Sequence, residues 1–277
     1  MESMTTICPS HGDYADPTGA VVNACPQCAE EVKNLKSQFY AEWQTYWHWK
    51  RCGLPARYKS KTIENWIPKN EEQESAHKVV EAYAGNINAR VKNGQGLTLL
   101  GPPGIGKTHL LAALVTGAHA AGVRAKYCLW HDLVMSLRQQ FSSADKKAQS
   151  TAMNGATQCP LLALDEIAQG LGTDWEHRQL FALIDHRYRE GLPLIISTNA
   201  TAKDLPQLVG ERIADRLAEV NAPISIPGSS QRRTLSQNEG SLALQAPPES
   251  IEVTYHAYGK LKTETVYQPI DSKFPVR

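Results

Sequence analysis

The stretch GPPGIGKT, residues 101–108, constrains the fold of this chain of 277 residues more than any other feature. It follows the apolar run Leu97–Leu100 and precedes a helical pattern, the context in which a G-x-x-x-x-G-K-[ST] match predicts a phosphate-binding loop. The glycines let backbone N–H groups turn toward phosphate oxygens, the lysine reaches the β- and γ-phosphates, and the threonine hydroxyl binds Mg²⁺. The alternative is a chance glycine-rich turn before a helix. We expect nucleotide contacts from Gly101, Pro102, Pro103, Gly104, Ile105, Gly106, Lys107, Thr108 and His109.

A second motif, LLALDE at Leu161–Glu166, is an apolar run that ends in two carboxylates. Open α/β sheets bind ligands at the carboxyl ends of their strands, so these carboxylates are expected beside the phosphates. Asp165 is predicted to hold Mg²⁺ through water, and Glu166 to orient and deprotonate the attacking water. The alternative is an ordinary acidic pair at a helix N-terminus. A kinase would need an acceptor pocket, which no motif indicates, so the two motifs together predict hydrolysis of a nucleotide.

Two further polar positions extend the predicted site. Asn199 ends the buried run Leu194–Ser197 and is expected to touch the γ-phosphate or the attacking water; the alternative is an asparagine in the turn after a strand. In GERIADRL, residues 210–217, Arg212 and Arg216 stand one helical turn apart and therefore share a helix face. One of them is a candidate for the arginine that stabilises transition-state charge in a neighbouring subunit's site, and the other is a surface charge.

Short apolar runs alternate with helical patterns through the middle of the chain, which is typical of an α/β fold with a parallel sheet. Asn70 is expected to cap a helix whose apolar residues continue to Val91. No apolar run approaches the roughly 18 residues that would span a bilayer, so we expect a cytoplasmic protein with no membrane partner. The formal net charge of +1 gives no global field for nucleic acid. Five strands are predicted, at Leu97–Leu100, Val123–Leu129, Leu161–Leu164, Leu194–Ser197 and Ile224–Ile226.

The N-terminal residues place Cys8-x-x-His11 before Cys25-x-x-Cys28, two close ligand pairs separated by a loop. This set is typical of a closed, structural Zn²⁺ site, whose metal supplies the folding energy of a small module, on the order of 10–16 kcal/mol in zinc-finger peptides. The alternative is two incidental turns with reduced thiols. The remaining cysteines are scattered singly and are expected to be buried thiols: Cys52, Cys128 and Cys159.

Three segments outside these motifs have a recognisable composition. Between Ala29 and Lys50, aromatic and apolar residues recur at helical spacing, and this face is expected to pack within the N-terminal module or to bind a partner. The segment Gly53–Asn70 contains two prolines and several basic residues, which predicts a linker. Beyond Gly240 the apolar density falls, so we expect a tail that is extended or ordered only against a partner.

The motifs GPPGIGKT, LLALDE, STN and GERIADRL, in this order, resemble those of the AAA+ ATPases of the bacterial helicase-loader group, the DnaC/DnaI type. Near relatives of that group are the IstB-type helper ATPases of transposons. The resemblance covers residues 53–234 and implies a five-stranded AAA+ sheet that binds ATP and Mg²⁺. It also implies that Asn199 is the sensor 1 residue and Arg216 the arginine finger that acts across subunits. Arg232 matches the sensor 2 position, and Arg233 is a close rival.

The resemblance further implies a function and an arrangement of domains. Residues 1–52 would form a zinc-binding domain that docks on a hexameric replicative helicase of the DnaB type, 53–70 a linker, 71–239 the AAA+ ATPase domain and 240–277 a tail. The protein would load the helicase onto single-stranded DNA and form a homo-oligomer with ATP or on the helicase. The insertion from Arg138 to Cys159 would touch that DNA through Phe141, Lys146 and Lys147, unless it is a solvated polar loop.

Two other functions remain open. A transposition helper of the IstB type would bring a transposase, rather than a helicase, to target DNA. A nucleotide-binding scaffold with negligible turnover is the third possibility, and the intact Glu166 argues against it.

Overall fold

The computed structural model describes residues 5–15, 25–142, 151–167, 172–230, 246–257 and 260–268. The chain divides into two compact units. The small unit consists of Met1–Trp47 together with Gln245–Arg277, and the large unit is His48–Leu244.

The large unit is built on a five-stranded parallel sheet with the order β4-β5-β6-β3-β7. This confirms the predicted fold class. The last strand begins at Asn221 rather than Ile224 and contains Pro223, which an edge strand tolerates because one of its sides needs no N–H donor. The strands are β3 (Gly96–Leu100), β4 (Ala125–Leu129), β5 (Leu161–Asp165), β6 (Leu194–Thr198) and β7 (Asn221–Ser225).

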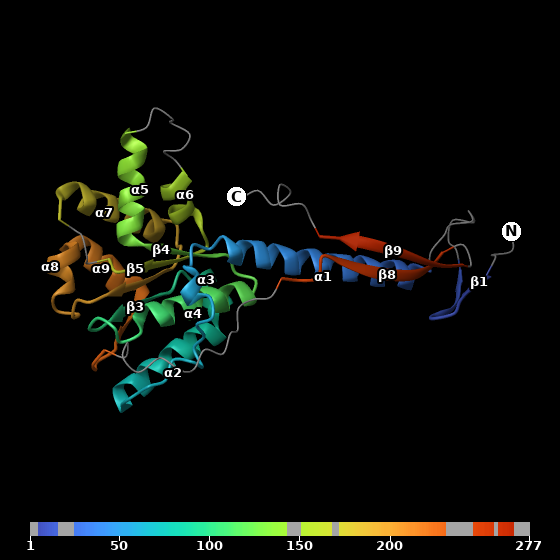
Figure 1. Cartoon of the computed structure of the whole chain (residues 1–277), viewed down its shortest axis with the longest axis horizontal. Coiled ribbons are helices and arrows are strands. Elements are labelled where there is room, and N and C mark those ends of the chain that lie inside the picture. The colour runs from blue at the N-terminus through green and yellow to red at the C-terminus, as the bar shows by residue number, and fades with distance from the viewer. Residues whose placement is uncertain are drawn as a thin grey trace. The chain divides into compact units, whose positions relative to one another are not determined.

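Helices cover both faces of this sheet, with α2 and α4 on one side and α5, α6 and α7 on the other (Figure 1). The Asn70 side chain accepts a hydrogen bond from the Gln73 N–H at 2.8 Å and caps α2, although the predicted helix divides into α2 and α3 at Asn86. None of the helices in the described ranges is both long and apolar enough to cross a bilayer. The helices of this unit are α2 (Glu71–Gly85), α3 (Ile87–Lys92), α4 (Lys107–Ala120), α5 (Trp130–Ser142), α6 (Thr151–Gln158), α7 (Asp174–Arg189), α8 (Leu205–Val209) and α9 (Glu211–Val220), with a short 3₁₀ turn at Ala56–Tyr58.

The core of the large unit includes the interior strand β5, whose residues Leu161–Asp165 are all buried. Because both faces of the sheet are covered, the strand is apolar at consecutive positions instead of alternating. Arg187 of α7 is also buried, and its guanidinium donates to the carbonyls of Ala156, Cys159 and Pro193 at 2.8, 2.9 and 2.6 Å. These bonds satisfy carbonyl groups at the end of α6 and before β6, so they fix the approach to two strands.

The segment Gly53–Asn70 differs from the linker predicted for it. Leu54, Ile63 and Trp66 are buried within the large unit, and the Trp66 indole N–H donates to the Ile105 carbonyl at 3.3 Å. The prolines and glycine prevent regular helix, but the three apolar side chains supply enough buried surface to hold the segment in place. The segment is therefore part of the large unit.

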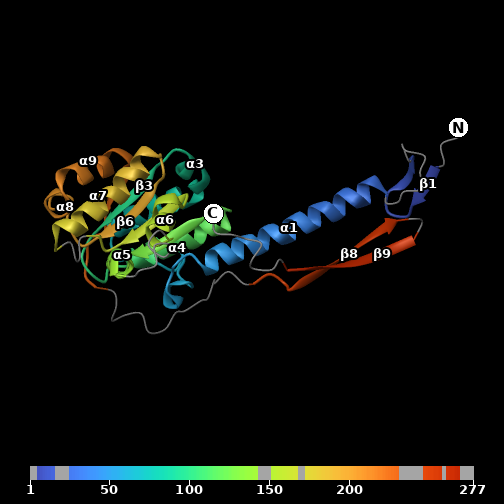
Figure 2. The same cartoon turned by 90° about the horizontal axis from the view of Figure 1, so that it is seen from above.

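The small unit contains two antiparallel strand pairs and most of one long helix, α1 (Pro26–Lys50). Strands β1 (Thr5–Cys8) and β2 (Gly12–Ala15) form the first pair, and β8 (Ser250–Ala257) and β9 (Lys260–Tyr267) form the second. The second pair runs beside α1 (Figure 2).

The β8–β9 hairpin corrects the expectation of an extended tail beyond Gly240. Val253 and Val266 point onto α1, where they are buried with Phe39 and Trp43, and the Trp43 indole N–H donates to the Pro248 carbonyl at 3.0 Å. The low apolar density was misleading because only one face of the hairpin is buried. The aromatic face of α1 is thus largely covered by its own chain, whereas Leu35 remains 49% exposed.

Candidate nucleotide site and metal cluster

The loop between β3 and α4 has the conformation that its glycines permit. Gly104 and Gly106 have φ values of 81° and 102°, in the left-handed region that other residues rarely adopt. A Cβ atom at Gly104 would lie 2.2 Å from the Ser230 hydroxyl oxygen, and one at Gly106 would lie 2.2 Å from the Trp66 indole nitrogen. The loop therefore passes too close to its neighbours for a side chain, and α4 begins directly after it at Lys107. The N–H groups at the start of α4 are the ordinary partners of a phosphate.

Lys107 is almost fully buried at the head of α4. Its ammonium donates to the carbonyls of Gly101 and Pro102 at 2.7 and 2.9 Å and to the Asn199 side-chain oxygen at 2.7 Å. The structure thus brings Lys107 together with Asn199, two residues that sequence reasoning assigned to one site. Their charge and amide lie where β3 and β6 end, at the carboxyl edge of the sheet.

Asp165 is the last residue of β5, and Glu166 follows it at the same edge. The Tyr127 hydroxyl donates to Oδ2 of Asp165 at 2.8 Å, and the Ser197 hydroxyl donates to Oδ1. Glu166 has a φ of 57°, and its N–H donates to the Ser197 hydroxyl oxygen at 3.1 Å. Sequence reasoning missed Tyr127 and Ser197. The serine was detectable as a polar residue inside a buried strand, whereas Tyr127 has no local signal.

A pocket of about 390 Å³ opens beside these carboxylates. Thr108, Asp165 and Glu166 contribute to its lining, together with Tyr127 of β4 and Asp132 of α5. A hydroxyl and two carboxylates are the hard oxygen ligands that Mg²⁺ prefers, and Thr108, which supplies the hydroxyl, directly follows the glycine loop and Lys107. The residues present therefore fit a nucleotide with its Mg²⁺.

His109 was predicted as a nucleotide contact, but its ring is bonded elsewhere in this structure. Its Nε2 lies 2.8 Å from the Thr62 carbonyl oxygen and donates to it. Burial lowers the pKa of His109 to about 4, so the imidazole is neutral near pH 7. The His109 side chain therefore links α4, through this hydrogen bond, to the segment that precedes α2.

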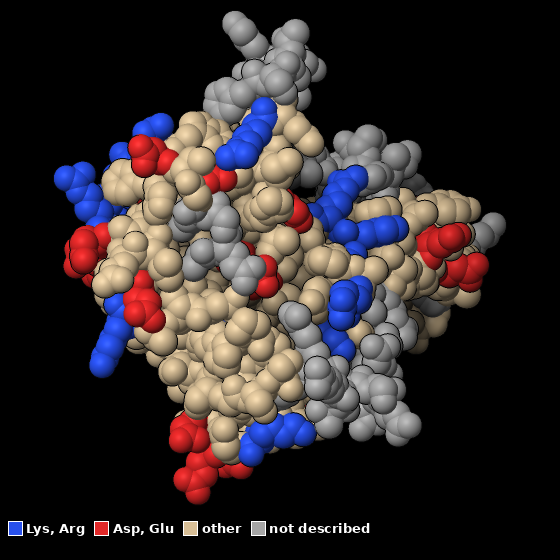
Figure 3. Space-filling model, turned by 60° about the vertical axis from the view of Figure 1, so that its left-hand side comes forward, with Lys and Arg blue, Asp and Glu red and all other residues tan. Residues whose placement is uncertain are grey.

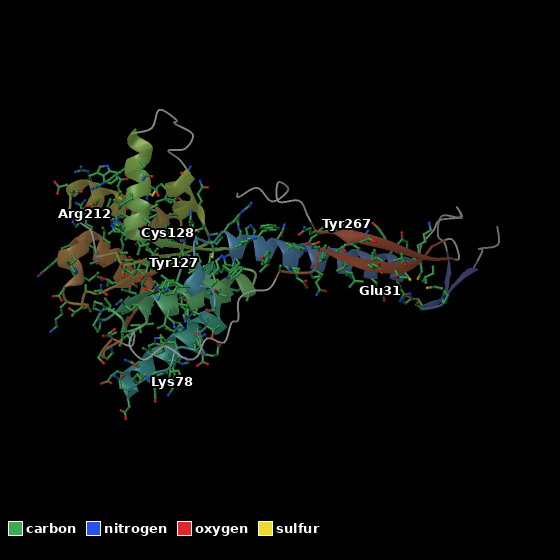
Figure 4. The ribbon with its side chains drawn as sticks, in the orientation of Figure 1. Glu31, Lys78, Tyr127, Cys128, Arg212 and Tyr267 are labelled. Atoms are coloured by element: carbon green, nitrogen blue, oxygen red, sulfur yellow. The ribbon has the colours of Figure 1, made fainter. Side chains whose placement is uncertain are left out.

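Of the two arginines predicted on α9, Arg216 is the one held in place. Its guanidinium lies 2.6 Å from the Asp185 carboxylate and packs over the rings of Phe181 and Tyr188, at 4.9 and 5.6 Å. Arg212, one turn earlier, is exposed (Figure 4). Arg232, Arg233, Lys146 and Lys147, with the side chain of Phe141, lie outside the described residues, so their predicted roles stay predictions.

The small unit brings Cys8, His11, Cys25 and Cys28 together, with all four ligand atoms within 4.8 Å of one another. The Cys8 and Cys28 sulfurs are 3.6 Å apart, and the His11 Nδ1 lies 3.3–3.6 Å from the three sulfurs. A disulfide would require about 2.0 Å, whereas tetrahedral Zn²⁺ with bonds of about 2.3 Å to sulfur places two sulfurs about 3.8 Å apart. The spacing fits a shared metal ion and not a disulfide.

The surroundings of this cluster also suit a metal. The second ring nitrogen of His11, Nε2, lies 3.0 Å from the Glu31 carboxylate, the kind of outer partner that fixes the orientation of a metal-bound imidazole. Burial raises the pKa of Cys8, but hydrogen bonds from the Ser10 backbone and from His11 outweigh it and lower that pKa to about 6. The cluster therefore favours the thiolate form that binds metals.

Comparison with known proteins places these features in a family. The model of the IstB-like ATP binding protein family matches residues 57–238. A putative ATP-binding protein of insertion sequence IS21 from Pseudomonas aeruginosa is 28% identical over 236 residues, which are 81% of this chain and 86% of that protein. The replicative helicase loader DnaC of Escherichia coli strain K12 is 25% identical over 171 residues, 60% of this chain. That match spans 66% of the loader's length.

Solved structures give the same picture of the fold. A crystal structure of the DnaC helicase loader matches with a TM-score of 0.57 at 26% identity, over 62% of this chain and 99% of that chain. The crystal structure of DnaI matches with a TM-score of 0.53 at 20% identity, over 65% of this chain and 94% of that one. The replication initiator DnaA bound to AMPPCP and single-stranded DNA has a TM-score of 0.53 at 23% identity, over 64% and 51%. The last two show likeness of fold alone.

Proposed function

Because this chain belongs to the IstB-like ATP-binding family and is an AAA+ P-loop ATPase, we propose that it is an ATP-driven loader of a replicative helicase. In this proposal the small unit binds the hexameric helicase, and the large unit uses ATP to control the placing of that ring on single-stranded DNA. The similarity to the DnaC loader, in sequence and in fold, supports this choice.

The observation that carries the proposal is that the small unit lies outside the match to the family model. The family match begins at residue 57, so residues 1–47 and 245–277 lie outside it. A module with its own candidate metal cluster and exposed apolar side chains, such as Leu35 and Tyr267, has the features of a partner-specific docking element. We therefore assign the helicase contact to the small unit as a whole, in place of residues 1–52 alone.

We propose that this module holds one structural Zn²⁺ per chain through Cys8, His11, Cys25 and Cys28. The ligand spacing and the Glu31 partner of His11 support this ligand set. All four protein ligands would fill a tetrahedral shell, which leaves no open position for catalysis.

In the large unit, the proposed roles follow the geometry of the nucleotide site. Lys107 and the N–H groups of the glycine loop bind the phosphates, and Thr108 and Asp165 hold Mg²⁺, which when bound neutralises charge on the β- and γ-phosphates. Glu166 accepts a proton from the attacking water, while Asn199, bonded to Lys107, orients that water.

Arg216 completes the site of a neighbouring subunit by stabilising charge on the transferred phosphoryl group, so hydrolysis needs an assembled oligomer. In the isolated chain Asp185 holds this guanidinium, and assembly exchanges that partner for phosphate. Arg232 is assigned to the same nucleotide as its sensor 2 residue.

The DNA contact is proposed for the insertion from Arg138 to Cys159. On the face shown in Figure 3, basic and acidic side chains both occur in small separate groups, and the formal net charge of the chain is only +1. Binding to DNA would then depend on a local group such as Lys146 and Lys147 with Phe141.

The test is a helicase-loading assay on single-stranded DNA coated with single-strand binding protein. Full-length protein with ATP should increase unwinding by the host's replicative helicase, and Lys107→Ala should not, because it cannot hold the phosphates. Absence of both helicase binding and stimulation would contradict the proposal.

A transposition helper is the second candidate, and one observation favours it. The IS21 relative matches 81% of this chain, against 60% for the DnaC loader. If the protein co-purifies with a transposase and directs it to target DNA, while leaving helicase loading unchanged, this second function replaces the first.

A further inference from the structure

The carboxylate of Asp165 is held by two hydroxyl groups from outside its own strand. Asp165 is 1% exposed, Tyr127 donates to its Oδ2 at 2.8 Å, and Ser197 donates to its Oδ1. An ionised carboxylate offers about four lone-pair positions, so one position on each oxygen remains for other partners. The two bonds fix the plane of the carboxylate without using up its capacity to bind a hydrated cation.

The two donors come from opposite sides of β5. Tyr127 belongs to β4 and Ser197 to β6, and these are the two strands that flank β5 in the sheet. Tyr127 lies next to Cys128 within the sheet region of the large unit (Figure 4). A side chain held from both neighbouring strands has little freedom to rotate, which is the condition for a preorganised site.

Ser197 also reaches the second acidic residue. Its hydroxyl oxygen accepts the Glu166 N–H at 3.1 Å while its proton goes to Asp165. Glu166 has a φ of 57°, a left-handed conformation that costs a non-glycine residue about 1–3 kcal/mol and persists only where the surroundings enforce it. One buried serine thus fixes both Asp165 and the backbone that aims Glu166.

Tyr127 is itself fixed at the open edge of the sheet. It stands on the edge strand β4, and its N–H donates to the Cys52 carbonyl at 2.6 Å. A Cβ at Gly53 would lie 2.3 Å from the Tyr127 carbonyl oxygen, so the backbone after α1 packs directly against this residue. Burial, followed by the negative charge of Asp165, raises the pKa of Tyr127, so the phenol keeps the proton that it donates.

We propose that Tyr127 and Ser197 are positioning residues, which hold the Asp165 carboxylate and the Glu166 backbone in the arrangement that receives Mg²⁺ with ATP. This inference rests on the proposed magnesium role of Asp165 and is independent of which partner the protein serves. Loss of such an outer hydrogen bond typically lowers metal affinity 10- to 100-fold. Nucleotide affinity without metal should be unaffected, because both hydroxyls donate to Asp165, whereas Lys107 and the glycine loop are proposed to bind the phosphates.

The test measures Mn²⁺ binding by the full-length protein with a non-hydrolysable ATP analogue, using the electron paramagnetic resonance signal of free Mn²⁺. The variants are Tyr127→Phe and Ser197→Ala, with Tyr83→Phe as matched control. Tyr83 is also buried and its hydroxyl donates to the Gln95 carbonyl at 2.7 Å, so Tyr83→Phe removes a buried tyrosine hydrogen bond away from the site. Tyr127→Phe and Ser197→Ala should each weaken Mn²⁺ binding about tenfold and leave the affinity for the analogue in EDTA unchanged. The control, Tyr83→Phe, should leave both affinities unchanged.

Two results would overturn the inference, and they are distinguishable through Asp165→Asn. If Asp165→Asn weakens Mn²⁺ binding but Tyr127→Phe and Ser197→Ala bind it like the wild type, the two hydroxyls have no positioning role. If Asp165→Asn also binds Mn²⁺ normally, the magnesium role of Asp165 fails and the inference with it. Thermal melts followed by circular dichroism show whether each variant folds. If Tyr127→Phe does not fold, the Mn²⁺ affinity of Ser197→Ala tests the positioning role.

Discussion

The two units of this protein bury their apolar surface in different ways. In the large unit one sheet is covered on both faces, and Leu161–Leu164 of its interior strand β5 are fully buried. The described residues of the small unit form two minor clusters, one of Phe39 and Trp43 with the β8–β9 hairpin, and one of three cysteines with Tyr255. Modules with so little core generally need a metal or a covalent link. We therefore expect the large unit to be stable by itself and the small unit to depend on a bound metal.

Removal of metal should give the largest effect. Chelation should unfold the small unit and leave the large unit folded, because zinc contributes about 10 kcal/mol to the folding of comparable peptides. Elemental analysis should find one zinc per chain, and Cys25→Ser should abolish it. Cys159→Ser is the control, since Cys159 lies near Arg187 in the large unit. Zinc retained by Cys25→Ser would show that the cluster is not the metal site.

Loss of Arg216 should give the next largest effect, a fall in the rate of ATP hydrolysis by the large unit. Arg216→Ala should reduce ATP hydrolysis of the assembled protein by about 10³-fold, because the transition-state charge loses its partner. Arg212→Ala, one turn earlier on α9, is the matched control. Mixing Arg216→Ala with Lys107→Ala should restore part of the rate, since one mixed interface keeps both groups. Equal rates for the two arginine variants would rule out the finger role.

Glu166→Gln separates binding from chemistry within the large unit. Turnover should fall about 10²-fold, because the general base is lost, while ATP affinity stays near that of the wild type. Glu190→Gln, an exposed position after α7, serves as control. Single-turnover kinetics and fluorescent-nucleotide binding measure the two quantities, and wild-type turnover would assign the base elsewhere.

Gly53→Ala addresses the backbone that follows α1. The substitution forces a Cβ to within 2.3 Å of the Tyr127 carbonyl at a φ of 88°, which should destabilise the large unit by about 2 kcal/mol. Gly117→Ala on α4, where a Cβ meets nothing within 4 Å, should stabilise it slightly. Urea unfolding measures the free energy of unfolding of both variants. If Gly53→Ala leaves it unchanged, the backbone around the Tyr127 carbonyl shifts at little cost to make room for the Cβ.

What could be predicted from the sequence depends on whether a feature is set by neighbouring residues or by contacts between distant parts of the chain. Features encoded in neighbouring residues were predictable, among them the apolar strand runs and the spacing of Cys8, His11, Cys25 and Cys28. The β8–β9 hairpin was missed because its partner, α1, lies at the other end of the chain. Its alternation at Ile251, Val253 and Tyr255 was a usable signal of period two.

Contacts within the nucleotide site were likewise predictable only where the residues themselves form a recognisable local pattern. Lys107 and Asn199 were assigned together because each follows a recognisable strand. Tyr127 and Asp165 are 38 positions apart, and only the pairing of β4 with β5 makes them neighbours. The linker prediction for Gly53–Asn70 failed for a related reason, since Trp66 finds its partner at Ile105 in the nucleotide loop.

The central claim is that the small unit docks on the helicase and the large unit binds ATP. Its most direct test is the affinity of the full-length protein for the host's replicative helicase, compared between wild type and Cys25→Ser. The wild type should bind, and Cys25→Ser should lose binding while it retains the ATP affinity of the wild type. Binding of the helicase by Cys25→Ser with wild-type affinity would contradict the assignment of docking to the zinc-stabilised small unit.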